Sequence, residues 1–270
     1  MIIGIFLGTV RALSNNTWPI IWLGLELNLI SFVPTIIKQE TNKKPAIIYF
    51  IIQRIGSIIL LSAGILTESK TSLVFFLLLG LVIKLGAAPL HFWLPGILVN
   101  LETLGLYLII RWQKLAPIIL IATIFIRKDI LSYFNLWTGT LLILAISRPI
   151  IVIIFSGVGQ IGWLIIIHSK ILIFFLFIYF IILMPIIKFL KTKSKNFLWG
   201  ILNAGGLPPF SGFIIKLKAI MFIKKKRAFI FIRASAVALS CYSRIILNSY
   251  YSSEKINKIT YLSLLAGSLV

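Results

Sequence analysis

The sequence contains few acidic residues and few charges of any kind. It has 6 Asp and Glu against 27 Lys and Arg, and charged residues make up 12% of its 270 residues. Soluble domains carry about 25% charged residues because their surface faces water. The chain is 60% hydrophobic with a mean hydropathy of +1.07, so polar groups cannot cover a globule made from it. We therefore predict a polytopic membrane protein whose outer surface faces lipid.

Cysteine and histidine are also scarce. The single cysteine, Cys241, excludes an internal disulfide and any site built from several cysteines, such as an iron–sulfur cluster. His91 and His168 have no accompanying group of carboxylates or thiols, so no metal site is expected. Residues 1–8 lack the basic stretch of a signal peptide and the Arg-rich pattern of a transit peptide. We expect insertion by the chain's own first helices, or synthesis in the compartment where it works.

The excess of basic residues gives a formal net charge of +21. On a soluble protein this charge would indicate a nucleic-acid partner. Here many bases lie in short connectors between apolar runs, so the expected counter-charges are anionic phospholipids such as cardiolipin, or acidic partner subunits, and no nucleic acid. The basic run at 224–227 is assigned either to such a lipid or to a protein. Codon bias toward Lys, Ile, Phe and Asn in an AT-rich genome would produce the same excess without any function.

Apolar runs bounded by polar residues, Pro or Gly predict the membrane spans, since a helix needs about 20 apolar residues to cross the hydrocarbon. The expected spans are 2–13, 17–37, 45–66, 71–91, 103–126, 129–147, 149–168, 170–190, 196–223 and 228–248, with a short remnant at 259–270. The connectors are short, and none is long or polar enough for an extramembrane domain. The predicted fold class is all-α, a polytopic bundle of about ten to eleven transmembrane helices, with residues 1–270 forming a single transmembrane domain.

Two of these spans are interrupted by Gly and Pro. Residues 84–95 read K-L-G-A-A-P-L-H-F-W-L-P, and residues 205–216 read G-G-L-P-P-F-S-G-F-I-I-K. Proline lacks an amide hydrogen, so carbonyls go unpaired at each break, and these are tolerated only where protein or water satisfies them. Broken helices at corresponding positions of two halves are typical of ion sites in transporters. They predict an antiporter-like pseudo-repeat with polar groups beside each break.

Four ionisable residues lie inside apolar spans. They are Glu26, Lys84, Lys114 and Lys216. A charge near the bilayer centre costs several kcal/mol, so it usually faces a partner or a hydrated cavity and marks an ion pathway. Burial favours a neutral lysine and an acidic neighbour favours a charged one, so such a row is suited to passing protons. We expect the side chains to point into one interior polar file, with Glu26 within about 4–6 Å of Lys84.

One other motif carries no function in our interpretation. Residues 157–162 spell G-x-G-x-x-G, but residues 163–190 contain no Asp or Glu and continue as lipid-length hydrophobics. A dinucleotide-binding fold needs an acidic residue about 20 positions further on, within a strand–turn–helix unit. Small residues that let two helices approach closely are the better explanation.

Five motifs of this sequence resemble subunit 2 of mitochondrial NADH:ubiquinone oxidoreductase, respiratory complex I, and they occur in the same order as in that family. They are W-L-G-L-E-L-N-L-I-S-F-V-P at 22–34, Y-F-I-I-Q at 49–53, the two broken segments, and W-Q-K-L-A-P at 112–117. The resemblance implies an antiporter-like, proton-translocating subunit of the membrane arm in the mitochondrial inner membrane. It makes Glu26, Lys84, Lys114 and Lys216 the proton pathway, and His91 falls on the family's histidine after the first break.

The resemblance also implies the partners. These are the other membrane-arm subunits and accessory subunits of complex I. NADH, FMN, iron–sulfur clusters and ubiquinone then belong to those other subunits, and this chain holds no cofactor. It is an enzyme subunit without a redox centre.

The sequence departs from the family's pattern at three positions. Gln160 replaces a histidine; it can hydrogen-bond water as part of a polar relay but exchanges no proton near neutral pH. Arg54 and Arg111 occupy positions that are usually uncharged, and Arg111 lies one turn before Lys114. Two alternatives to a proton-pumping subunit therefore stay open. One is a free-standing cation/proton antiporter on the same scaffold, and the other is a structural subunit whose pathway has lost its function.

Overall fold

The computed structural model describes residues 2–15, 17–39, 43–66, 70–124, 129–146, 148–167, 169–188, 190, 195–208, 210–223 and 225–253. The helices are α1 (Ile2–Ser14), α2 (Trp18–Gln39), α3 (Lys44–Leu66), α4 (Lys70–Leu85), α5 (Trp93–Leu98), α6 (Thr103–Tyr107), the π-helix η1 (Leu108–Trp112), α7 (Gln113–Ile124), α8 (Asp129–Ala145), α9 (Pro149–Ile166), α10 (Ser169–Lys188), α11 (Lys195–Gly205), α12 (Ser211–Met221) and α13 (Lys225–Ser253).

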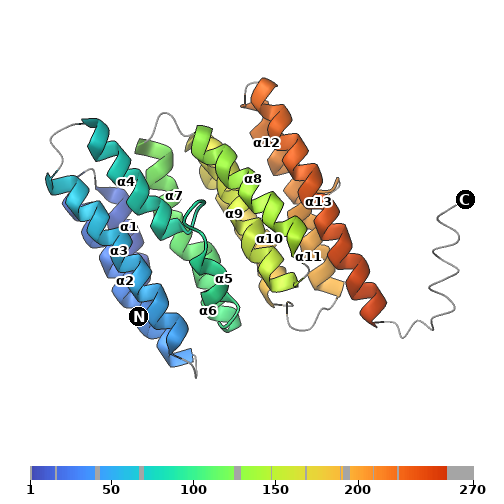
Figure 1. Ribbon diagram of the computed structural model, residues 1–270, viewed down its shortest axis with the longest axis horizontal. Helices are drawn as coiled ribbons and strands as arrows, with labels where there is room; N and C mark the ends of the chain where they lie inside the picture. The colour runs from blue at the N-terminus through green and yellow to red at the C-terminus, as the bar shows by residue number, and fades with distance from the viewer. Residues whose placement is uncertain are drawn as a thin grey trace, which may run out of the picture.

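The long helices lie side by side in a row and tilt in a common direction (Figure 1). The row begins with α1, α2 and α3, continues through α4 and α7 to α8, α9 and α10, and ends with α11, α12 and α13. Many large hydrophobic side chains on the outside of this row are exposed, including those of Ile3, Ile58, Phe75 and Ile130. Such a surface is stable in lipid and not in water, which agrees with the composition.

The predicted spans match the helices in order. Within the described residues, five helices are long and apolar enough to cross a membrane, and four further apolar helices are shorter. Two expected spans differ from the structure: the span at 71–91 ends as a helix at Leu85, and the span at 196–223 is divided into α11 and α12. Both differences follow from Gly and Pro at the breaks. The expected remnant at 259–270 lies outside the described residues.

Close helix pairs begin each half of the chain. Helices α1 and α2 approach so closely that a Cβ atom on Gly24 would lie 2.5 Å from the backbone nitrogen of Ala12. Helices α8 and α9 meet in the same way, because a Cβ atom on Gly139 would overlap the backbone of Gly159 and one on Gly162 would lie 2.6 Å from the carbonyl oxygen of Ser132. Of the glycines at 157–162, Gly159 and Gly162 therefore lie in a helix–helix contact of the predicted kind, and α9 continues through this segment as a helix.

The first half ends in a helix that changes its winding. Helices α6, η1 and α7 form one continuous span, Thr103–Thr123, with the π-helical turn in its middle. π-Helical turns are rare in proteins overall, and those that occur often lie at functional sites. The wider turn contains Arg111 and ends at Trp112, two residues before Lys114.

Helix α13 runs beside α8 and contacts both of its ends. Arg227 forms an ion pair with Asp129 at the start of α8, with Nη1 and Oδ1 2.8 Å apart. At the other end, Arg244 donates from Nη2 to the carbonyl oxygens of Ile143, Leu144 and Ile146. The last carbonyls of a helix have no partner within it, and a cation there is favourable. Of the basic run at 224–227, Arg227 is therefore occupied by an acidic neighbour, while the side chains of residues 224–226 lie outside the described part.

Candidate functional site

Glu26 lies between two cations from neighbouring helices. Its Oε2 accepts a hydrogen bond from Nη1 of Arg54 on α3 at 2.7 Å, and its Oε1 lies 3.8 Å from Nζ of Lys84 on α4. The side chains of Glu26 and Lys84 are 6% and 4% exposed, whereas that of Arg54 is 42% exposed. The expected proximity of Glu26 to Lys84 is present. The closer partner is Arg54, which the sequence indicated only as an unusual charge.

The first break follows Lys84 directly and is held by two polar side chains. Helix α4 ends at Leu85, and Gly86 has a positive φ of 61° that favours glycine. Gln53 on α3 donates from Nε2 to the carbonyl oxygen of Lys84 at 3.1 Å. Asn135 on α8 accepts a hydrogen bond from the backbone N–H of Ala88 at 2.8 Å. Helix α8 belongs to the second half, so Asn135 joins the first break to the second half directly.

His91 lies just after this break and is buried. Its ring stacks on Phe92, with centroids 4.6 Å apart, and meets Phe155 of α9 edge-on at 5.8 Å. Its Nδ1 has no hydrogen-bond partner among the described residues. A buried ring nitrogen without a partner is costly, so this atom is suited to hydrogen-bond a water molecule.

Lys114 is buried on α7 and faces α9. A Cβ atom at Gly157 would lie 3.5 Å from Nζ of Lys114 and 4.0 Å from the hydroxyl oxygen of Tyr179, so glycine leaves space beside the ammonium group. Arg111 is also buried, with its guanidinium 4.1 Å from the centroid of the Tyr107 ring. Within the described residues, Nε and Nη2 of Arg111 have no hydrogen-bond partner. Two cations thus lie on this span without an acidic neighbour in the part of the chain that the structure describes.

The second break is organised by Lys216. This residue lies on α12, after the break, and its Nζ donates to the carbonyl oxygens of Ala204 at 3.1 Å and Gly205 at 2.8 Å, the last residues of α11. Asn203 completes the junction, because its Oδ1 accepts from the backbone N–H of Gly212 at 2.8 Å. The two breaks are therefore not copies of each other: Lys84 precedes its break and pairs with a carboxylate, whereas Lys216 follows its break and neutralises a helix end.

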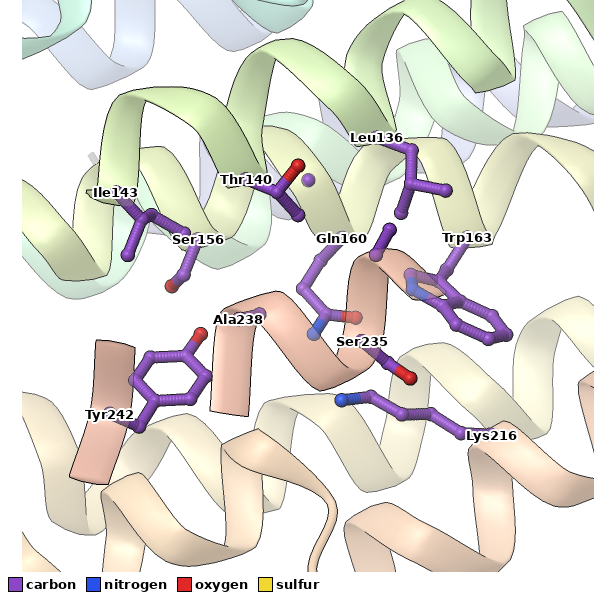
Figure 2. Close-up of a pocket in the computed structure, with 12 residues that line it drawn as sticks. Leu136, Thr140, Ile143, Ser156, Gln160, Trp163, Lys216, Ser235, Ala238 and Tyr242 are labelled. Carbon is purple, nitrogen blue, oxygen red and sulfur yellow. The ribbon is translucent and has the colours of Figure 1, made fainter. Parts of the chain in front are cut away.

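A small cavity lies beside Lys216, between α8, α9 and α13 (Figure 2). About 20 Å³ of it is accessible to the centre of a water molecule, enough to hold one water. Figure 2 shows the Gln160 amide and the Lys216 ammonium group pointing toward each other, and the Tyr242 hydroxyl pointing toward Ser156. A second, smaller space of about 10 Å³ joins Gln160 and Lys216 to Tyr179. Tyr179 also borders Gly157, which faces Lys114, so polar groups lead from Lys114 to Lys216.

The structure thus places all six candidate residues in the interior, with no more than 8% of any of them exposed: Glu26, Lys84, His91, Lys114, Gln160 and Lys216. It brings Glu26 to Lys84 and Gln160 to Lys216. Sequence reasoning missed the amides at the breaks and the two tyrosines. Their only signal was that Asn135, Asn203, Tyr179 and Tyr242 are polar residues inside apolar spans.

No protein-family profile matches the chain as a whole or in part. Individual relatives are nevertheless similar to it over most of their length. NADH-ubiquinone oxidoreductase chain 2 of Artemia franciscana is 30% identical over 232 residues, covering 78% of this chain and 76% of that protein. The chain belongs to the NADH-ubiquinone oxidoreductase chain 2 family. This membership confirms the resemblance carried by the five motifs, and with it the predicted location as a multi-pass protein of the mitochondrial inner membrane.

Two solved structures share the fold of this chain 2 family member. A chain of respiratory complex I from Thermus thermophilus superposes with a TM-score of 0.77 at 18% identity, over 91% of this chain and 69% of that chain. A chain of the Mrp complex from a Dietzia species superposes with a TM-score of 0.77 at 16% identity, over 90% of this chain and 59% of that chain. At these identities the likeness shows the fold alone. It confirms the predicted all-α, antiporter-like bundle.

Proposed function

We propose that the chain is a membrane-arm subunit of a proton-pumping NADH:ubiquinone oxidoreductase and that it carries protons along a buried file. The file runs from Glu26 and Lys84 through Lys114 to Lys216, with His91 and Gln160 as polar relays. The single observation that carries this proposal is the burial of one glutamate and three lysines inside a bundle whose outer surface is apolar. Buried charges of this kind have no packing value and mark ion paths.

The first transfer involves the proton on Nζ of Lys84. The Glu26 carboxylate, 3.8 Å away, favours the charged form of this lysine, and a change in their separation alters its hold on the proton. Lys114 then receives the proton through internal water. The space beside Gly157 and the groups around Tyr179 and Gln160 lead on to Lys216. Gln160 orients water there and neither gains nor loses a proton, because an amide does not titrate near neutral pH.

In this proposal the electrons pass through other subunits. NADH, FMN, iron–sulfur clusters and ubiquinone are bound there, and residues 1–270 act as a single transmembrane domain without a redox centre. The partners are the other membrane-arm and accessory subunits of the complex, together with anionic phospholipid such as cardiolipin. The basic residues of the connectors would attract such lipid.

A free-standing cation/proton antiporter is the second candidate. The observation behind it is the fold that this chain shares with a chain of the Mrp complex. Membership of the NADH-ubiquinone oxidoreductase chain 2 family favours the first candidate.

Substitution of Lys84 tests the proposed pathway. Lys84→Ala removes a titratable site and leaves Oε1 of Glu26 without a cation, so we expect both proton pumping and coupled NADH oxidation to fall. Lys84→Arg keeps the charge but does not release a proton readily, so we expect normal assembly with impaired turnover. Pumping and NADH:quinone turnover are measured in membranes whose content of complex has been checked. Wild-type rates in both variants would remove Lys84 from the mechanism.

A further inference from the structure

Glu26 is shared unequally between a guanidinium and an ammonium group. Nη1 of Arg54 lies 2.7 Å from Oε2, a charge-assisted hydrogen bond, whereas Nζ of Lys84 lies 3.8 Å from Oε1, beyond hydrogen-bond distance. Oε1 has no hydrogen-bond partner among the described residues. The proton-carrying lysine therefore lies in the field of Glu26 without being tied to it, and the tight contact is made by the arginine.

The net charge of this three-residue site changes when Lys84 loses its proton. With Lys84 protonated, the three side chains carry two positive charges and one negative charge. When the proton leaves, a matched pair of Arg54 and Glu26 remains, because a guanidinium does not lose its proton in proteins. Without the arginine, departure of the proton would leave an isolated carboxylate with 6% exposure, which is strongly unfavourable.

Arg54 approaches Glu26 from a different helix and a more exposed side than Lys84 does. It comes from α3, a different helix from Lys84, and its side chain is 42% exposed on the outer side of that helix. Its guanidinium lies 5.3 Å from the centroid of the Phe50 ring, one turn earlier. The arginine reaches the buried carboxylate from outside, whereas Lys84 and its break lie on the inner side.

We propose that Arg54 is the resident counter-charge of Glu26: a positioning residue that keeps Glu26 ionised and fixed while Lys84 gives up its proton. The inference rests on the proposed function, since it assumes that Lys84 exchanges a proton. Arg54 itself transfers none. It makes the neutral state of Lys84 the charge-balanced state of the site.

The test reads the protonation state of Glu26 by infrared spectroscopy of the purified complex. In Lys84→Met, Arg54 remains, so Glu26 stays ionised and shows no carboxylic-acid C=O stretch. In the double variant Lys84→Met/Arg54→Gln the carboxyl has no cation, so we expect that stretch to appear. Adding Glu26→Gln to each variant identifies the band, which must disappear. A Glu26 band already present in Lys84→Met, or absent from the assembled double variant, would overturn the proposal.

Assembly gives a second measurement in case the double variant fails to fold. Its failure would come from the buried, unpaired carboxylate, so the triple variant with Glu26→Gln must restore the complex. A triple variant that also fails to assemble would overturn the proposal, because Glu26 would then not be the cause.

Turnover tests whether the counter-charge matters for function. In Arg54→Gln we expect NADH:quinone turnover to fall several-fold, because release of the Lys84 proton would then leave the buried Glu26 carboxylate without a cation. Arg54→Lys keeps the charge and should recover most of it. The matched control is Arg233→Gln, on an exposed arginine of α13 whose guanidinium lies over the Phe229 ring. Wild-type turnover in Arg54→Gln would overturn the role of Arg54.

The two proposals fail separately. Wild-type pumping in Lys84→Ala would end the proposed proton pathway. The infrared band reports the charge of Glu26 whether or not the complex pumps.

Discussion

At the scale of single residues, the molecule treats its buried lysines in three different ways. Lys84 faces a carboxylate, Lys216 faces the carbonyl end of a helix, and Lys114 faces a glycine and a tyrosine hydroxyl. A carboxylate, a set of backbone dipoles and a neutral hydroxyl attract an ammonium group with decreasing strength. The surroundings of the three lysines therefore favour the charged form to different degrees. The direction in which a proton moves along the file then depends on which lysine's surroundings change.

The contacts of Lys216 lead to a prediction with a control on the same helix. In Lys216→Met the carbonyls of Ala204 and Gly205 lose their donor, so we expect a loss of about 1–3 kcal/mol in stability together with loss of pumping. Lys218→Met removes an exposed lysine whose ammonium lies 5.0 Å from the Phe174 ring, so it should change stability by less than about 1 kcal/mol and leave pumping intact. Thermal inactivation and pumping of the purified complex measure both. Equal effects of the two substitutions would contradict the assigned role of Lys216.

At the scale of helices, glycines allow close packing of the regular segments, and polar side chains hold the irregular ones. Gly24 in the first half, and Gly139 and Gly162 in the second, let helix backbones approach, which replaces the hydrophobic driving force that is lacking between helices in lipid. Side chains then fix the irregular parts: Gln53 and Asn135 hold the first break and Asn203 the second. These hydrogen bonds to freed backbone groups give the breaks a defined geometry.

The packing of α8 on α9 gives a prediction at this scale. Gly139→Ala places a methyl group against the backbone of Gly159, which cannot move like the end of a flexible side chain, so we expect a loss of about 1–3 kcal/mol or more and little assembled complex. Gly105→Ala is the control, because a Cβ atom there would meet Leu101 at an ordinary 3.7 Å. The amount of complex on native gels compares the two. Normal assembly of the Gly139 variant would show that the helices can separate without cost.

At the scale of the whole molecule, helix α8 connects the two halves. Asn135 contacts the first break, while Leu136, Thr140 and Ile143 of the same helix line the cavity beside Lys216. Arg227 and Arg244 of α13 hold its two ends. A shift of α8 along its axis would therefore displace side chains at both breaks. Helix α8 thus links the two halves mechanically.

The whole protein is expected to purify together with other subunits of the complex. After extraction in mild detergent we expect the chain to co-migrate with flavin-containing subunits and with NADH dehydrogenase activity, because the file has no redox centre of its own in the proposed function. Native electrophoresis with an in-gel NADH stain measures this, and a soluble matrix dehydrogenase serves as the control for non-specific co-migration. A lone transporter oligomer without flavin would favour the cation/proton antiporter instead.

The membrane class, the order of the spans and the residues of the proposed file could all be predicted from the amino-acid sequence. Hydrophobic composition and Gly/Pro punctuation are local properties, and a lysine inside an apolar run such as that around Lys84 is conspicuous wherever it lies in space. The close helix approach at Gly159 and Gly162 was likewise predicted, because the hydrophobic run continues beyond them.

The partners of those residues were decided by the tertiary structure. Arg54 is 28 positions from Glu26, and Asn135 is 47 positions from Ala88, so no local pattern could pair them. The side chains that hold the first break, Gln53 and Asn135, likewise come from helices distant in sequence. Sequence alone shows that charges are buried in a membrane bundle. Only the packing of helices decides which charge faces which, because distance in space, and not along the chain, sets the electrostatic energy.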